Sequence, residues 1–159
     1  MSYEAVMKVL EEKGFANRMT VHTVPCDTVP HAAECIGCSE AEIAKTMSFL
    51  TADGPVVIVC AGDVKVANSK FKAFFCEKAR MVPWELVAET IGHEPGGVCP
   101  FALAEGVRVY LDESLRRFGT VHAAGGEPAA TVMVHPEEFE VLCEGAVWAD
   151  LTSPVCQNV

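Results

Sequence analysis

The feature that most constrains the fold is an uninterrupted apolar run at residues 55–61, Pro-Val-Val-Ile-Val-Cys-Ala. A short run rich in β-branched residues fits a strand that is buried on both faces. Asp53-Gly54 stands directly before this run, and another apolar stretch, 47–51, precedes that turn. Because Asp-Gly between two apolar runs favours a tight hairpin, the sequence predicts a β-hairpin whose second arm is a central strand.

Helices and strands alternate along the rest of the chain. Caps, prolines and glycines predict helices between Ser2 and Gly14, at 29–36, from Asn68 or Ser69 through Phe75, and at 83–91, 113–118 and 136–143. Further strands are predicted at about 20–25, 107–111, 120–124, 130–135 and 146–150. In the helix that starts at Pro83, we expect Trp84, Val87 and Ile91 to face inward. This order predicts an α+β (irregular α/β) fold with a mixed sheet and helices around it, in a single domain spanning 1–159.

The charge balance and the apolar segments exclude some partners and environments. The formal net charge is −10, whereas a protein that reads duplex DNA is usually basic, so we expect no DNA partner. No apolar run approaches the roughly 20 residues that cross a bilayer, so we expect no membrane association. The first 13 residues are amphipathic and carry three glutamates, unlike a signal or transit peptide. The sequence therefore predicts a cytoplasmic protein.

Eight cysteines are spread through the chain, and one pair, Cys35 and Cys38, is closely spaced. A structural zinc site requires a second such pair or two nearby histidines, and neither is present. A thioredoxin-type pair follows a strand, whereas this pair spans a predicted helix end at Gly37. We therefore expect mainly buried thiols, no metal and no cofactor, and keep a zinc or thiol-redox protein as a less favoured alternative.

The sequence lacks the common catalytic motifs, including the GxSxG elbow, the HExxH pair and the phosphate-binding Walker loop. Two other features carry polar chemistry. Lys45 is predicted where a helical turn meets a strand, and in a last helical turn its charge would simply complement the helix dipole. The loop 96–100, Gly-Gly-Val-Cys-Pro, is either a tight surface connection or a set of unobstructed amides able to hold an anion or an oxyanion.

Taken together, segments along most of the chain resemble the YbaK/EbsC family. They are Ile-Ala-Lys-Thr-Met-Ser-Phe at 43–49, Ala-Gly-Asp at 61–63, Lys-Phe-Lys at 70–72, Gly-His-Glu-Pro-Gly-Gly-Val-Cys-Pro-Phe at 92–101 and Val-Tyr-Leu-Asp-Glu-Ser-Leu at 109–115. That family shares its fold, a twisted, partly barrel-like mixed sheet surrounded by helices, with ProX and the prolyl-tRNA synthetase editing domain. The lysine on which the YbaK/EbsC family relies matches Lys45, and the GxxxP motif of the family matches Gly96 and Pro100.

The resemblance implies a trans-acting deacylase that hydrolyses the ester of a mischarged tRNA, expected to be a proline tRNA carrying cysteine or another small amino acid. The expected catalytic groups are Lys45 and the backbone of Gly96, Gly97 and Val98. A lysine has an ordinary pKa near 10.4, so we expect Lys45 to bind a phosphate or ribose, or to stabilise charge, and not to act as a base. The expected substrate-binding residues are Thr46, Pro100, Phe101, His31, Gly125 and Gly126. Alanine-specific relatives carry a His-Pro segment near the turn where this chain reads Ala-Ala-Gly-Gly-Glu-Pro (123–128), so alanine specificity is in doubt.

A basic segment is the expected contact for the tRNA acceptor end. Residues 65–80 hold five basic side chains and one acidic one, and Lys65, Lys70 and Lys72 are the predicted tRNA-binding residues. Few phosphate contacts give weak, salt-sensitive binding, so an aminoacyl-tRNA synthetase is a possible partner that presents the tRNA. The main alternative is a non-catalytic module that binds an aminoacyl or nucleotide end in a regulatory or envelope-associated role.

Overall fold

The computed structural model describes residues 2–155 and has a four-stranded sheet at its centre. The strands are β2 (Ala44–Thr51), β3 (Gly54–Ala61), β5 (Arg108–Asp112) and β8 (Val147–Ala149), in that order. β2 and β3 form the predicted antiparallel hairpin, while β3, β5 and β8 run parallel. Every residue of 56–61 is fully buried, which confirms that the apolar run forms an inner strand.

The remaining strands form two smaller sheets. One has the antiparallel order β1 (Met19–Val21), β7 (Ala130–Val134) and β6 (Val121–Ala124), and the other pairs β4 (Val64–Val66) with β9 (Thr152–Pro154). A single parallel bridge between Ile43 and His122 joins the small three-stranded sheet to the start of β2. The sheets do not close into a barrel. The predicted mixed α+β architecture is confirmed, although the strand expected at 20–25 ends at residue 21 and the short β4 and β9 were not predicted.

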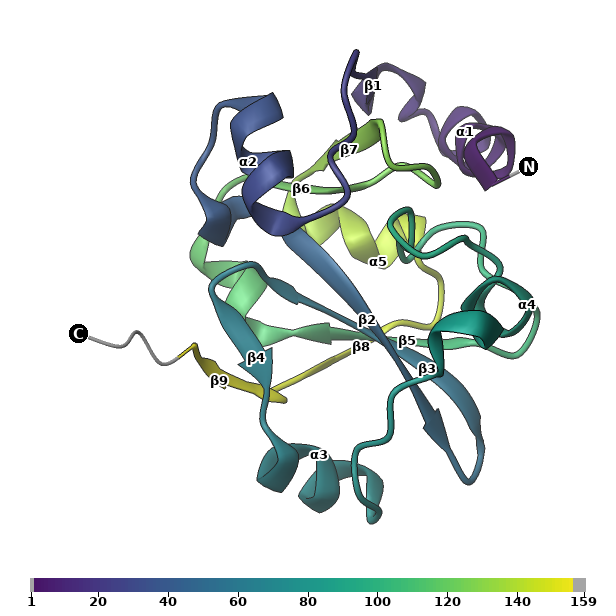
Figure 1. Ribbon diagram of the computed structural model, residues 1–159, viewed down its shortest axis with the longest axis vertical. Helices are drawn as coiled ribbons and strands as arrows, with labels where there is room; N and C mark the ends of the chain where they lie inside the picture. The colour runs from purple at the N-terminus through teal and green to yellow at the C-terminus, as the bar shows by residue number, and fades with distance from the viewer. Residues whose placement is uncertain (1, 156–159) are drawn as a thin grey trace.

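Five α-helices surround the sheets in the described part of the chain: α1 (Ser2–Lys13), α2 (Val29–Ile36), α3 (Asn68–Phe75), α4 (Val87–Ile91) and α5 (Phe139–Leu142). Short 3-10 turns occur at η1 (Ala16–Arg18), η2 (Glu40–Glu42), η3 (Trp84–Leu86), η4 (Glu113–Arg117) and η5 (Pro136–Glu138). Figure 1 shows α1, α2 and the three-stranded sheet above the central sheet and α3 below it. Within residues 2–155, no helix has the length and apolarity that crossing a bilayer requires.

One predicted helix is wrong in a way that matters for the site. Pro83 stands before the 3-10 turn η3, and regular α-helix begins only at Val87. Trp84 therefore does not share the inward face with Val87 and Ile91, and 75% of its surface is exposed. The prediction that Trp84 faces the core is wrong because helical spacing does not extend across the 3-10 turn.

The free edge of β2 is covered in two places and open between them. Leu50 N–H donates to the carbonyl of Arg80 (2.8 Å) and Val82 N–H donates to that of Ser48 (3.1 Å), so segment 80–82 covers the far half. The Ile43–His122 bridge covers the start. Because backbone groups alternate along a strand, Thr46 directs its backbone to this same edge, and no backbone group of residues 2–155 outside the β2–β3 ladder pairs with it. The fold thus leaves a gap in the edge of β2 at Thr46.

Asp112, at the end of β5, links the turn η4 and the start of β9 to the central sheet. Its buried carboxylate accepts hydrogen bonds from the Ser114 N–H (2.9 Å), the Leu151 N–H (2.7 Å) and the Thr152 hydroxyl (2.7 Å). These bonds connect the turn η4 and the entry to β9 to the central sheet.

We predict that Asp112→Ala lowers the free energy of unfolding by about 3 kcal/mol, because three donors lose a charged acceptor in a buried place. Urea unfolding monitored by circular dichroism measures this change. Asp53→Ala, in the exposed hairpin turn, is the control and should change stability by less than about 0.5 kcal/mol. Equal stability of the two variants would contradict the role given to Asp112.

Candidate active site

A cavity of about 510 Å³ lies at the open part of the β2 edge. Its walls come from β2, the start of α2, the loop 92–101, the segment 81–87 and strand β6. Four of the predicted site residues line it: Lys45, Thr46, Gly96 and Val98. The cavity therefore brings together two sequence segments that are fifty residues apart and that were singled out separately.

Lys45 is the second residue of β2, opposite Cys60 on β3. The alternative that it complements a helix dipole is wrong, because the preceding turn η2 ends at Glu42. No ion pair or hydrogen bond to the Lys45 ammonium is formed within the described residues. Burial raises the pKa of Cys60 to about 12, although the Lys45 charge lowers it, so this neighbour stays a neutral thiol and does not cancel the lysine charge. The Lys45 charge is thus left for a ligand.

The Lys45 charge lowers the pKa of one acidic group, the Asp63 carboxyl. A hydrogen bond from Arg117 (3.0 Å) is the main cause that holds the pKa of the Asp63 carboxyl below its ordinary value, and the charges of Arg117 and Lys45 add to it. The Asp63 carboxylate is therefore paired with Arg117, and the Lys45 charge acts on this carboxylate only at longer range.

Thr46 presents an unsatisfied polar group to the cavity. Its Oγ1 is buried and has no hydrogen-bond partner in the structure. Leaving a buried hydroxyl unpaired costs about 1–3 kcal/mol, which a bound polar group can offset. Together with the unpaired backbone edge, this hydroxyl makes Thr46 suited to hold the polar part of a small ligand.

The loop 92–101 offers two free backbone amides and not three. Gly97 N–H donates to the carbonyl of Glu94 (3.0 Å), which closes a turn, and Gly97 does not line the cavity. The expectation that the Gly97 amide acts on the substrate is therefore corrected. Gly96 (φ 93°) and Val98 do line the cavity, and neither amide donates to a backbone or side-chain acceptor in the described residues.

Gly97 has a packing role instead. A Cβ atom at this position would lie 2.8 Å from the carbonyl carbon of Gly126 and 2.9 Å from the backbone of Glu127. Gly126 in turn packs against Ser2, whose carbonyl oxygen would lie 2.8 Å from a Cβ at Gly126, and the Ser2 hydroxyl donates to the carbonyl of Gly92 (3.3 Å). The first turn of α1, the turn at 125–128 and the loop are therefore stacked in close backbone contact.

His93 closes the loop at its other end. Its Nε2 lies 2.6 Å from the carbonyl oxygen of Phe101, which can only accept, so Nε2 carries the proton. Burial lowers the pKa of His93 below its ordinary value, so the ring is neutral. Phe101 itself is fully buried and stacks on Phe139 with ring centroids 6.2 Å apart. The hydrogen bond from His93 to Phe101 thus joins the two ends of the loop that contains Gly96 and Val98.

Five other predicted residues lie outside the cavity. Phe101 and Pro100 are buried, and the thiol of Cys143 donates to the Pro100 carbonyl (3.4 Å). Gly125 and Gly126 form the turn before β7, where the N–H of Gly125 donates to the carbonyl of Ala130 (2.8 Å). His31 is exposed on α2, 3.3 Å from Asp27 Oδ1. None of the five lines the cavity, so any contact with the substrate's reacting end is indirect.

Sequence reasoning missed several residues that do line the cavity, notably Asp27, Ser48, Met81 and Trp84. Asp27 directly precedes Thr28, whose hydroxyl accepts from His31 N–H and caps α2, so a polar residue before a helix cap was the available signal. The position of Met81 depends on its bridge to Phe49, which joins segments far apart in the sequence. No local pattern reveals that contact.

The predicted tRNA-binding lysines differ in their surroundings. Lys65 and Lys72 are exposed, whereas Lys70 donates to Asp150 Oδ1 (2.8 Å) and to the carbonyl of Thr152 (2.7 Å). Lys70 therefore fastens α3 to the entry of β9. Residues 2–155 contain no cluster of three or more histidine, cysteine or acidic side chains placed to hold a metal ion, and Cys35 and Cys38 belong to no such group.

A model of the aminoacyl-tRNA editing domain family matches residues 23–142, which include every wall of the cavity. The chain belongs to the aminoacyl-tRNA editing domain family. This confirms the resemblance to the relatives of the prolyl-tRNA synthetase editing domain.

Individual proteins similar to this editing domain support its membership in the family. The uncharacterized protein YwhH of Bacillus subtilis (strain 168) is 41% identical over 152 residues, covering 95% of this chain and 97% of YwhH. The proline–tRNA ligase of Limosilactobacillus fermentum is 30% identical over 105 residues, which are 62% of this chain and 18% of the ligase. A crystal structure of a protein described as a candidate trans-editing enzyme for prolyl-tRNA synthetase superposes with a TM-score of 0.86 at 29% identity, covering 96% of this chain and 97% of that one.

We predict that Gly97→Ala lowers the free energy of unfolding of the editing domain by about 1–3 kcal/mol, because the added methyl overlaps the backbone of Gly126. Gly119→Ala is the matched control, since nothing lies within 4 Å of a Cβ there, and its effect should stay below about 0.5 kcal/mol. Chemical unfolding of both variants provides the comparison. A neutral effect of Gly97→Ala would show that the loop is not packed as described.

A second prediction concerns pH. The pKa of His93 is lower in the folded state than in the unfolded chain, so below about pH 6.5 the unfolded state takes up a proton that the folded state does not. Stability conferred by His93 is therefore complete above pH 6.5 and falls as the pH drops, by up to about 1.4 kcal/mol per unit. His93→Asn should flatten the curve of unfolding free energy between pH 6.5 and 5. Parallel curves for wild type and His93→Asn would refute this.

Proposed function

We propose that this editing domain is a trans-acting deacylase that hydrolyses the ester between a wrongly attached amino acid and the end of a tRNA. The supporting observation is the shared cavity, where the Lys45 ammonium, the unpaired Thr46 hydroxyl and the free amides of Gly96 and Val98 border one space. Its volume of about 510 Å³ lies in the range of small-molecule sites. Membership in the editing family supports the assignment of tRNA as the substrate.

The chemistry requires little from side chains. An aminoacyl ester is already labile, and attack by water on its carbonyl produces a tetrahedral oxyanion. Collapse releases the free amino acid and restores the hydroxyl of the terminal ribose. In this proposal the unpaired amides of Gly96 and Val98 donate to the oxyanion, and removing one such donor in other enzymes slows the reaction about 100- to 1,000-fold. The Lys45 ammonium stabilises negative charge on the substrate, either at the terminal phosphate or at the reacting ester.

A proline tRNA carrying cysteine or another small amino acid is the proposed substrate. The similarity to proline–tRNA ligases and to the candidate trans-editing enzyme supports the proline tRNA. Size exclusion discriminates weakly, since one methylene is worth only about 1–3 kcal/mol, so more than one small amino acid should be accepted. The net charge of −10 limits affinity for the rest of the tRNA, and a synthetase is the proposed partner that presents it.

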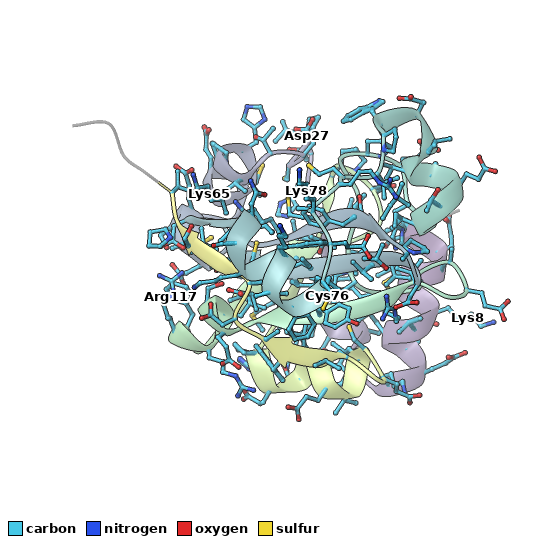
Figure 2. All side chains as sticks on the ribbon, turned by 90° about the horizontal axis from the view of Figure 1, so that it is seen from below. Lys8, Asp27, Lys65, Cys76, Lys78 and Arg117 are labelled. Carbon is cyan, nitrogen blue, oxygen red and sulfur yellow. The ribbon has the colours of Figure 1, made fainter. Side chains whose placement is uncertain are left out.

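The decisive experiment is a deacylation assay with tRNAs charged with cysteine, alanine, serine, threonine or proline. We predict that Lys45→Ala lowers the rate on the best substrate by about 100-fold or more with the melting temperature unchanged. Lys8→Ala removes a charge from the exposed face of α1, far from Lys65 in Figure 2, and should keep wild-type activity.

Two outcomes would contradict the proposal. Full activity of Lys45→Ala would remove that residue from the mechanism. Absence of turnover by the wild type on every charged tRNA, with binding retained, would favour the non-catalytic module over the deacylase.

A further inference from the structure

Trp84 is an exposed aromatic ring at the mouth of the cavity. It is 75% exposed and yet lines the cavity, next to Met81, which is 53% exposed. The other tryptophan, Trp148, is engaged: its indole N–H donates to Glu140 (3.1 Å), and the Arg116 guanidinium lies 3.8 Å from its ring centroid. Within the described residues, Trp84 has no ring, cation or hydrogen-bond partner. A large apolar surface left open beside a binding cavity indicates contact with a ligand.

The backbone that carries Trp84 is fixed to the central sheet. Met81 forms a bridge with Phe49, and the N–H of Val82 donates to the carbonyl of Ser48 (3.1 Å). Pro83 then restricts the chain before the turn η3. The backbone that leads into Trp84 is therefore held beside the same edge of β2 that carries Thr46.

The chain segment that leads to this rim carries unpaired positive charge. Lys78 and Arg80 are exposed and form no ion pair with any residue of 2–155, while the Glu77 carboxylate between the two basic stretches is occupied by the N–H of Ala52 (2.9 Å). Arg80 directly precedes Met81, which lines the cavity, whereas Lys78 borders a separate hollow beside Asn68 and Lys72 of α3. Glu85, on the other side of Trp84, is exposed and would repel a phosphate there, so the basic approach lies on the Lys78 side.

We infer that Trp84, supported by Met81, is a stacking platform for a nucleobase at the 3′ end of the aminoacylated strand. The inference rests on the proposed function, because the ester joins the amino acid to the terminal ribose. With the amino acid in the cavity, the ribose lies at the mouth and the base lies over the rim. Single-stranded ends are bound by aromatic rings that stack on bases and by cations that contact phosphates, and Trp84 with Lys78 and Arg80 supplies this combination.

The test uses binding of a short nucleic acid and does not depend on turnover. The chain has two tryptophans, so Trp148→Phe leaves Trp84 as the only indole fluorophore. In this background, the trinucleotide CCA should quench the fluorescence, and ribose 5-phosphate, which lacks a base, should not. Binding of fluorescently labelled CCA should weaken about 5- to 150-fold in Trp84→Ala and change little in Trp84→Phe, which keeps a ring. Leu86→Ala, on the same turn but outside the cavity, is the matched control.

The outcomes separate this inference from the proposed function. Unchanged CCA affinity in Trp84→Ala would overturn the stacking platform, even in an active deacylase. A response of Trp84 to prolyl-tRNA synthetase alone, with none to CCA, would overturn it as well and assign the ring to a protein interface. CCA binding that depends on Trp84 in a protein without deacylase activity would support the platform and refute the proposed function.

Discussion

The incompletely covered edge of β2 is the constraint on which the site depends. A free strand edge exposes unpaired amides and carbonyls and tends to attract another strand. Here the segment 80–82 covers one part and the Ile43–His122 bridge covers another, so only the stretch around Thr46 stays open. The opening is too short for a further strand and wide enough for a small ligand. The cavity thus arises from a local interruption of sheet pairing.

The second wall of the cavity is made of backbone held in place by its neighbours. In the loop 92–101 the groups proposed to act on the substrate are main-chain amides, and such groups are effective only if the chain cannot relax away from the ligand. His93 secures the loop from inside, and the close approach of Gly97 to Gly126 secures it from behind. This arrangement explains why no serine, cysteine or histidine nucleophile is needed for the proposed reaction.

Local sequence patterns predicted the elements that local interactions determine. The glycine at 37 located the end of α2, and the apolar run located β3. The pairing of Lys45 and Gly96 in one site came from family resemblance, since the fold alone brings these distant segments together. Errors occurred where a non-local contact decides the outcome, as with the turn that exposes Trp84 and the turn that occupies the Gly97 amide.

Phe101 shows a related limit. A sequence motif does not show which of its positions lie close to a ligand. In the folded loop, Phe101 is buried in the core, whereas Gly96 and Val98 border the cavity. Which members of a motif touch substrate depends on the direction in which each residue leaves the backbone. That direction is a property of the folded loop and is absent from the spacing.

The stacked contact of Ser2, Gly126 and Gly97 gives the first turn of α1 an effect beyond its own helix. Helix ends fray more readily than helix centres, and here the first turn of α1 is the outer support of the loop 92–101. A purification tag or fusion partner joined immediately ahead of Ser2 would push on that support. Strand β9 lies away from α1 in Figure 1, so an extension that follows it would spare the geometry of the loop.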